Sequence, residues 1–319
     1  MAKQLWHTNE FNTELKDVPL LNTGECTIKS MFSFISAGTE SLVISRSIPL
    51  AAHDFMKVPF MEGSFNLPCT YGYSLVGTIV SAQPSYPINS LVYLMHPHQD
   101  SIAVPAQSLT LIQSLPPKRA TLIANMETAL NACWDGQIQH GSKVLIAGYG
   151  IIGALVARVL KAEFNCNVSV AEINESRIDL LKQHGYDLDV NSIATYDIVF
   201  NTAANEKALQ CCIEKLNKNG TLIELSWYGN KSVQLDLGAH FHFNRIKLLS
   251  SQVSTISEHA PEGCTFEQRK QMVIEILKDD FYDQIITNEI PFSAAPEFFN
   301  QLRTSKALSG LGYVINYNL

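Results

Sequence analysis

Three side chains that could bind a metal ion alternate along one short stretch of this chain. The stretch "YLMHPHQDSIAVP" spans residues 93–105 and contains His96, His98 and Asp100. In an extended chain alternate residues share a face, and two imidazoles with a carboxylate are typical metal ligands. Three interpretations are open: a new metal site, the polar lining of a substrate pocket, or a hydrogen-bonded structural turn.

A second motif points to a bound dinucleotide. "KVLIAGYGIIGALVARVL" places Gly148, Gly150 and Gly153 in G-x-G-x-x-G spacing, between a predicted strand and a predicted helix, which is the context this motif needs. Gly148 would permit the tight turn, Gly150 would let the backbone approach a pyrophosphate, and Gly153 would let helix and strand pack closely. Ile151 and Ile152 complete the turn, at a helix N-terminus suited to an anion.

An acidic residue supports the dinucleotide interpretation and suggests which cofactor binds. Glu172 ends the next predicted strand, "VSVAE". A carboxylate there can accept hydrogen bonds from the ribose hydroxyls and repels a 2′-phosphate, which favours NAD. Arg177 follows and keeps NADP possible. A glycine-rich turn without a cofactor and a methyltransferase are the alternatives, and the order of strand, glycines, helix and acid favours the dinucleotide.

The elements around these motifs predict an α/β protein with two kinds of sheet. Residues 1–110 show short β-like runs broken by Gly and Pro, which indicates a mostly antiparallel unit. From about residue 125 predicted strands and helices alternate, which indicates a doubly wound parallel sheet covered on both faces. The segment "EKALQCCIEKLNKNG" (206–220) is expected to form one of these helices, and "KLLSSQVS" (247–254) to add one more strand.

Composition narrows the class of protein. The 319 residues are 46% hydrophobic, which allows more than one domain, and the net charge of −7 argues against a nucleic-acid partner. The seven cysteines contain no C-x-x-C pair, which fits buried thiols in a reducing compartment. The polar N-terminal sequence has no apolar signal region, and no window is apolar for long enough to span a bilayer. We therefore expect a cytoplasmic protein without a membrane partner.

Several short motifs together resemble the medium-chain dehydrogenase/reductase superfamily. They are "ISAGTE" (35–40), "YGYSLVG" (71–77), "NMETALNACWDG" (125–136), "GYGIIG" (148–153) and "ELSWYG" (224–229). Within that superfamily the chain is most similar to the zinc-lacking branch that resembles bacteriochlorophyllide a dehydrogenase.

This resemblance implies a domain organisation and an assembly. A GroES-like, β-rich catalytic domain would occupy residues 1–124, a Rossmann dinucleotide-binding domain residues 125–265, and a return segment that completes the catalytic domain residues 266–319. In the family the last strands of two nucleotide domains extend one sheet across a two-fold axis, so a homodimer is expected.

The resemblance also implies that the family's zinc ligands are missing. Ala37 stands where zinc-dependent relatives have a Cys, Tyr73 where they have a His, and Ala124 at the place of the third ligand. Between Cys69 and Cys133 there is no cysteine for a structural zinc lobe. We therefore expect no zinc, and the pocket-lining interpretation of the 93–105 stretch becomes the favoured one.

Without zinc, another group must act on the reacting oxygen. Tyr73 is the expected hydrogen-bond donor, Thr39 stands where relatives relay a proton, and His98 is the competing donor. Thr128 and Ile152 match positions that pack behind the nicotinamide ring. The expected substrate pocket includes His96, Asp100 and Trp227. Each of these residues has a plain structural alternative, such as packing or turn formation.

The function expected from these features is an NAD(P)-dependent, zinc-independent oxidoreductase. It would act on a carbonyl or secondary alcohol of a small molecule whose identity the sequence does not specify. Two alternatives remain: a quinone or enone reductase of the same fold, and a catalytically inactive dinucleotide-binding redox sensor.

Overall fold

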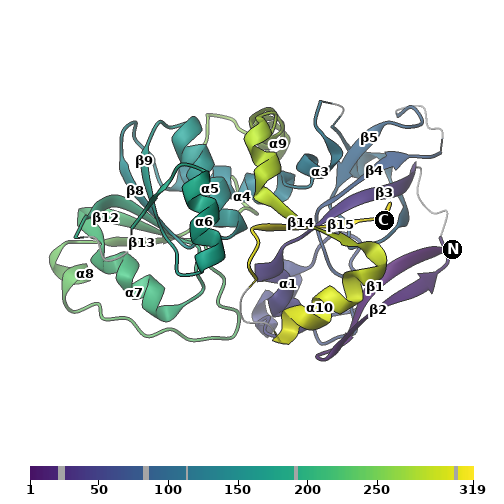
Figure 1. The fold of residues 1–319 in the computed structure, drawn as a ribbon, viewed down its shortest axis with the longest axis horizontal. Coiled ribbons are helices and arrows are strands. Elements are labelled where there is room, and N and C mark those ends of the chain that lie inside the picture. Colours follow the sequence, from purple (N-terminus) through teal and green to yellow (C-terminus); the bar gives the residue numbers. More distant parts are fainter. Residues whose placement is uncertain (21–25, 82–85, 113, 190–192, 305–307) are drawn as a thin grey trace. The chain divides into compact units, whose positions relative to one another are not determined.

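The computed structural model describes residues 1–20, 26–81, 86–112, 114–189, 193–304 and 308–319. The chain divides into two compact units, each of which is built from more than one segment (Figure 1). The first unit contains Met1–Ala124, Ile274–Leu308 and Gly312–Leu319, and the second contains Asn125–Val273 and Ser309–Leu311.

The first unit is built on a mostly antiparallel sheet. Buried residues alternate along the first half of its longest strand, where Cys26, Ile28 and Ser30 are inside and Lys29 is exposed. This period of two is expected for a strand with one face in the core. In sheet order the strands are β14 (Ile286–Pro291), β15 (Gly312–Asn316), β3 (Cys26–Ile35), β4 (Leu75–Ile79), β5 (Leu91–Leu94) and β7 (Thr110–Leu111), with β6 (Ser101–Val104) also paired to β3.

A hairpin and short helices complete this unit. Strands β1 (Ala2–Asn9) and β2 (Asn12–Val18) form the hairpin. Its Leu5 packs with Phe299 of the amphipathic helix α10 in one hydrophobic cluster. The helices are α1 (Ala37–Ile44), α2 (His53–Met56), α3 (Pro117–Ala120) and α10 (Ala295–Thr304), with 3-10 turns η1 (Leu50–Ala52), η2 (Ala106–Ser108), η3 (Asp280–Ile285) and η4 (Phe292–Ala294).

The second unit is a parallel sheet of the doubly wound type. Its strand order is β10-β9-β8-β11-β12-β13, and all neighbours run parallel. The order reverses between β8 and β11, which is where ligands bind in such sheets. The strands are β8 (Lys143–Ala147), β9 (Asn167–Ala171), β10 (Asp187–Leu188), β11 (Tyr196–Asn201), β12 (Leu216–Glu224) and β13 (Lys247–Ser250), and the helices are α4 (Ile123–Asp135), α5 (Ile151–Ala162), α6 (Glu175–Gln183), α7 (Glu206–Glu214), α8 (His240–Phe243) and α9 (Phe266–Ile276).

The predicted α/β class, a GroES-like β-rich domain with a Rossmann doubly wound domain, is therefore confirmed. Two local expectations need correction. The strand expected over 247–254 ends at Ser250, because the side chain of Gln252 accepts the N–H of Ser254 and turns the chain. The helix expected over 206–220 ends at Glu214, because Leu216 already pairs with Tyr196 in the sheet.

Among the helices formed by the described residues, none has the length and apolar content needed to cross a bilayer.

Candidate active site

The glycine-rich turn of the second unit has geometry that only glycine allows at two positions. Gly148 has φ +95°, and a Cβ on it would lie 2.9 Å from the hydroxyl oxygen of Thr202. A Cβ on Gly153 would lie 2.1 Å from the carbonyl oxygen of Gly148. The first glycine therefore serves the tight turn and the last serves the close packing of α5 on that turn.

At Gly150, in the middle of the turn, the nearest neighbouring side chain is the basic Arg177. Gly150 is the N-cap of α5 and supplies no side chain to the helix N-terminus. The described atom nearest to a Cβ built on Gly150 is the Nη1 of Arg177, at 3.7 Å. Free N–H groups of a first helical turn together with a guanidinium suit a bound pyrophosphate. This turn could hold a dinucleotide.

Glu172 is tied to the same turn by backbone hydrogen bonds. One carboxylate oxygen accepts the N–H of Tyr149 at 2.7 Å, and the other accepts the N–H groups of Ile173 and Asn174 at 2.7 and 2.9 Å. The Nη1 of Arg177 lies 4.0 Å from the first oxygen. Each carboxylate oxygen can accept two hydrogen bonds. The oxygen that holds Tyr149 therefore has capacity left for a ribose hydroxyl.

The other predicted cofactor residues lie in the same unit. Ile151 and Ile152 begin α5 and are half-buried, and Thr128 is half-buried on α4. Their contact with a nicotinamide ring stays a prediction.

A polar cluster lies at the carboxyl ends of β11 and β12, and two of its members, Asn201 and Glu224, were not expected at the site from the sequence. The buried Asn201 donates to the carboxylate of Glu224 at 2.8 Å and to the hydroxyl of Tyr228 at 3.2 Å, and Glu224 also accepts the N–H of Ser226. Burial raises the pKa of Glu224, although these hydrogen bonds oppose the shift. Trp227, expected in the substrate pocket, is half-buried beside this cluster. A polar residue that ends each of two consecutive apolar strands was the signal that could have revealed it.

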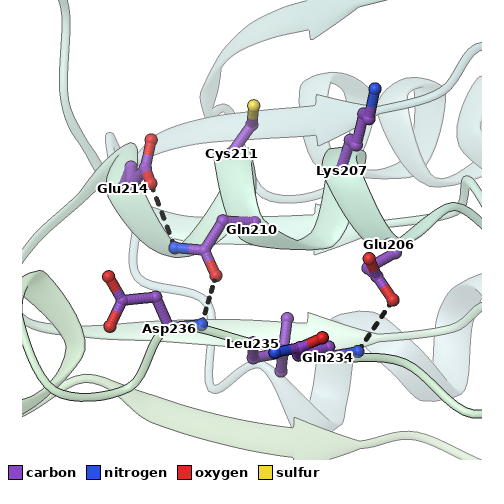
Figure 2. Close-up of a pocket in the computed structure, with 8 residues that line it drawn as sticks. All are labelled: Glu206, Lys207, Gln210, Cys211, Glu214, Gln234, Leu235 and Asp236. Atoms are coloured by element: carbon purple, nitrogen blue, oxygen red, sulfur yellow. Dashed lines mark hydrogen bonds between the residues drawn. The ribbon is translucent and has the colours of Figure 1, made fainter.

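A surface hollow of this unit, between α7 and residues 234–236, has a structural explanation (Figure 2). The side chain of Glu206 accepts the N–H of Gln234 at 2.8 Å, and that of Gln210 accepts the N–H of Asp236 at 2.9 Å. These groups of α7 satisfy the backbone of the neighbouring segment, whereas Cys211 points away from it. The hollow therefore gives no reason to assign a site there.

In the first unit the structure brings two predicted catalytic residues together. The hydroxyl of Tyr73, just before β4, hydrogen-bonds with the side chains of Ser36 and Thr39 at the start of α1. Burial raises the pKa of Tyr73, the two hydrogen bonds lower it, and the charge of Glu40 raises it further. The phenol is therefore protonated at neutral pH, as a hydrogen-bond donor must be. Its side chain keeps some exposed surface.

His98, the competing donor, is fully buried in a hydrogen-bonded chain. Its Nε2 lies 3.0 Å from a carboxylate oxygen of Glu40, and its Nδ1 lies 2.7 Å from the hydroxyl of Ser33. The Ser33 hydroxyl is in turn 2.9 Å from that of Tyr317. Both nitrogens of the ring are thus already engaged, and a direct role of His98 at the substrate stays a prediction.

His96 and Asp100, which alternate with His98, have unrelated partners. The Nδ1 of His96 lies 2.8 Å from the carbonyl oxygen of Pro97, and its ring stacks on Phe60. Burial lowers the pKa of His96 to about 4. Asp100 accepts the backbone N–H of Lys3 at 2.9 Å. Across the part of the chain that the structure describes, no three His, Cys, Asp or Glu side chains are grouped to hold a metal ion.

The two places where the resemblance would put zinc ligands do not supply them either. Ala37 has no donor atom, and the hydroxyl of Tyr73 is engaged with Ser36 and Thr39. A zinc site needs three or four Cys, His or carboxylate ligands, and this donor set offers none at these two positions.

Comparison with known proteins gives whole-length similarity to dehydrogenases. No family model matches the chain. The chain is 22% identical to the D-guloside 3-dehydrogenase of Escherichia coli, over 90% of this chain and 91% of that protein. Among solved structures it resembles 2R,3R-butanediol dehydrogenase from Bacillus subtilis (TM-score 0.79, 15% identity, 99% of both chains). It also resembles acetophenone reductase from Geotrichum candidum in complex with NAD (TM-score 0.76, 18% identity, 99% of this chain and 97% of that chain).

Proposed function

We infer that the chain is an NAD(P)-dependent oxidoreductase of the medium-chain, alcohol dehydrogenase-like type. It has the GroES-like and Rossmann domains of these enzymes, and its similarity to the D-guloside 3-dehydrogenase extends over nearly the whole chain. The observation that carries the inference is the open helix N-terminus at Gly150, flanked by Glu172 and Arg177.

We propose NAD as the preferred cofactor. The buried carboxylate of Glu172 keeps an acceptor for a ribose hydroxyl, and its negative charge disfavours a 2′-phosphate. Arg177 partly offsets that charge, which is why the preference is expected to be moderate. When bound, the cofactor supplies or accepts the hydride.

The reaction we propose is interconversion of a secondary alcohol and a ketone without zinc. Tyr73 would donate a hydrogen bond to the substrate oxygen, which becomes more negative as hydride reaches the carbonyl carbon. Thr39 would orient the phenol through their shared hydrogen bond. In the reduction the new alkoxide would take the proton of the Tyr73 phenol, which would be replaced from solvent through the partly exposed hydroxyl of Thr39, and in the oxidation a proton would pass to solvent by the reverse route.

For the substrate we propose a polyhydroxylated small molecule, since a relative that matches nearly the whole chain is named for a guloside. His96, Asp100 and Trp227 remain the proposed contacts of the pocket. The zinc-lacking branch that resembles bacteriochlorophyllide a dehydrogenase is the proposed subgroup.

The remaining elements of the proposal are a homodimer and a cytoplasmic location. Strand β13 ends the parallel sheet, and its Leu248 and Leu249 are 41% and 38% exposed. An apolar sheet edge of this kind favours pairing with a second copy. All seven cysteines are free thiols, which suits a reducing compartment.

The test is turnover with NADH or NAD and a panel of ketones, enones, glycosides and sugar acids. We expect reduction of a ketone with one NADH consumed per alcohol formed, or oxidation of a secondary alcohol with one NADH formed per ketone. A product in which a C=C bond is reduced, identified by mass spectrometry, would favour the enone reductase. Tight NADH binding with no turnover on the whole panel would favour the redox sensor.

A further inference from the structure

The two hydroxyls proposed to act on the substrate come from separate segments of the first unit. Tyr73 lies in the loop before β4, and Thr39 lies in the first turn of α1. A hydrogen bond between two side chains has the right direction only if both backbones are held.

His98 packs directly under the loop that carries Tyr73. Gly72 has φ +120°, and a Cβ on it would lie 2.9 Å from the Nε2 of His98. The backbone N–H of His98 also donates to the carbonyl oxygen of Tyr71 at 3.2 Å. The imidazole therefore fixes how closely the backbone of Gly72, the residue just before Tyr73, can approach His98.

Glu40, which lies in the first turn of α1, links the start of this helix to His98. One oxygen of its fully buried carboxylate accepts the N–H of Ser36 at 2.7 Å, and the other is 3.0 Å from the Nε2 of His98. Ser36 and Thr39 both hydrogen-bond with Tyr73. One carboxylate thus connects the helix that carries these hydroxyls to the imidazole under the Tyr73 loop.

Hydrogen bonds connect the pair formed by Glu40 and His98 to the sheet of the first unit. The Nδ1 of His98 is 2.7 Å from the hydroxyl of Ser33 on β3, and that hydroxyl is 2.9 Å from Tyr317, which follows β15. A buried pair of this kind adds little net stability compared with apolar residues of similar size. It does impose defined hydrogen-bond directions, which an apolar pair would not.

From this arrangement we propose that Glu40 and His98 are positioning residues, which clamp the loop before β4 to the start of α1 and so fix the hydrogen bond between Tyr73 and Thr39. The proposal rests on the proposed function of Tyr73. It assigns to His98 an indirect role, in place of proton donation to the substrate.

The kinetic test uses Glu40→Gln, His98→Gln and His98→Leu, each alone and combined with Tyr73→Phe. We expect each single variant to lower kcat about tenfold, with the Kd for NADH unchanged. In the Tyr73→Phe background the same substitutions should lower kcat little further, because the hydroxyl that Glu40 and His98 position is already absent. A full tenfold further loss in that background would overturn the proposal, and so would single variants with unchanged kcat.

The matched control is His7→Leu. His7 is also a fully buried histidine, its Nδ1 is 2.9 Å from the hydroxyl of Thr13, and its ring packs on Phe299, as does that of His98. We expect this variant to be destabilised but to keep its kcat. A tenfold fall in the kcat of folded His7→Leu would overturn the proposal, because the effect would then follow from disturbing this core.

A second measurement needs no turnover. With 3-fluorotyrosine placed at residue 73, the fluorine resonance of the cofactor-free protein reports the surroundings of the phenol. We expect Glu40→Gln and His98→Gln to shift or broaden it and His7→Leu to leave it unchanged. An unchanged resonance in folded His98→Gln would overturn the clamp. Absence of turnover in the wild type would instead overturn the proposed function and leave this result interpretable.

Discussion

The carboxylate of Glu172 accepts the backbone N–H of Tyr149 at 2.7 Å. The acid that ends β9 and the glycine-rich turn after β8 therefore form one hydrogen-bonded unit. A single side chain thus supports the shape of the turn and sets the charge that a bound ribose meets.

Removing the negative charge of Glu172 should reduce the preference of the protein for NADH over NADPH. We expect Glu172→Gln to reduce the ratio of the Kd values for NADPH and NADH by about tenfold, because the 2′-phosphate is no longer repelled. Calorimetry measures both constants. Glu175→Gln, three residues on and exposed, is the control and should leave the ratio unchanged. A wild-type preference for NADPH of tenfold or more would contradict the assignment of NAD.

Tyr73→Phe should reduce turnover and leave cofactor binding intact. The variant keeps the ring and removes only the hydroxyl, and such donors contribute about 10²-fold or more to the rate. We expect kcat to fall by that order with an unchanged Kd for NADH. Tyr71→Phe, which loses a hydrogen bond to the carbonyl oxygen of Met56, serves as the control. Full activity of Tyr73→Phe would refute the assigned role.

The purified protein should contain far less than one zinc per chain. The reason is the donor set, with Ala37 and Tyr73 at the ligand positions expected from the resemblance and separate partners for His96 and Asp100. Elemental analysis after dialysis against a weak chelator measures the content. About one zinc per chain that disappears in His96→Ala would identify the 93–105 stretch as a metal site after all.

His96 should make stability depend on pH below neutrality. Its pKa is lowered from 6.5 to about 4 by burial, so the unfolded chain binds a proton first as the pH falls. Stability is therefore fully present above about pH 6.5 and is lost progressively toward pH 4, by about 3 kcal/mol at most. Urea unfolding of wild type and His96→Gln should show a smaller loss in the variant. Equal losses in the two proteins would contradict this account.

Strand β13 should mediate a homodimer. We expect light scattering to give twice the chain mass at micromolar concentration. Leu249→Lys should shift the equilibrium toward the monomer, because a charge on the strand disfavours pairing at that edge. Lys247→Gln on the same strand is the control. A monomeric wild type would refute the proposal.

Much of the fold was predictable because it follows from local patterns in the sequence. Glycine spacing after a buried strand identified the turn at Gly148, and the alternation of strands and helices identified the parallel sheet. The end of α7 was not predictable in this way, since the pairing of Leu216 with Tyr196 is a long-range contact that overrides a continuous helical pattern.

Candidate site residues could be named from the sequence only where a motif or a resemblance pointed to them. Tyr73, Thr39 and His98 were proposed in this way and their roles stay predictions, whereas Glu40 was not named, because a glutamate near a helix start usually needs no special partner. Its proposed role comes from a contact with His98, 58 residues away. Asn201 and Glu224 were missed for the same reason, since they meet across two neighbouring strands.

The position of β15 has a consequence for synthesis. This strand, Gly312–Asn316, lies between β14 and β3 in the sheet of the first unit. A growing chain carries β3 early, but its partner β15 follows the whole of the second unit in the sequence. Until β15 has been made, the second half of β3, Phe32–Ile35, which pairs with β15, presents an unpaired edge of the kind that invites aggregation. A nascent chain of this protein should depend on chaperones in proportion to the time that this edge stays open.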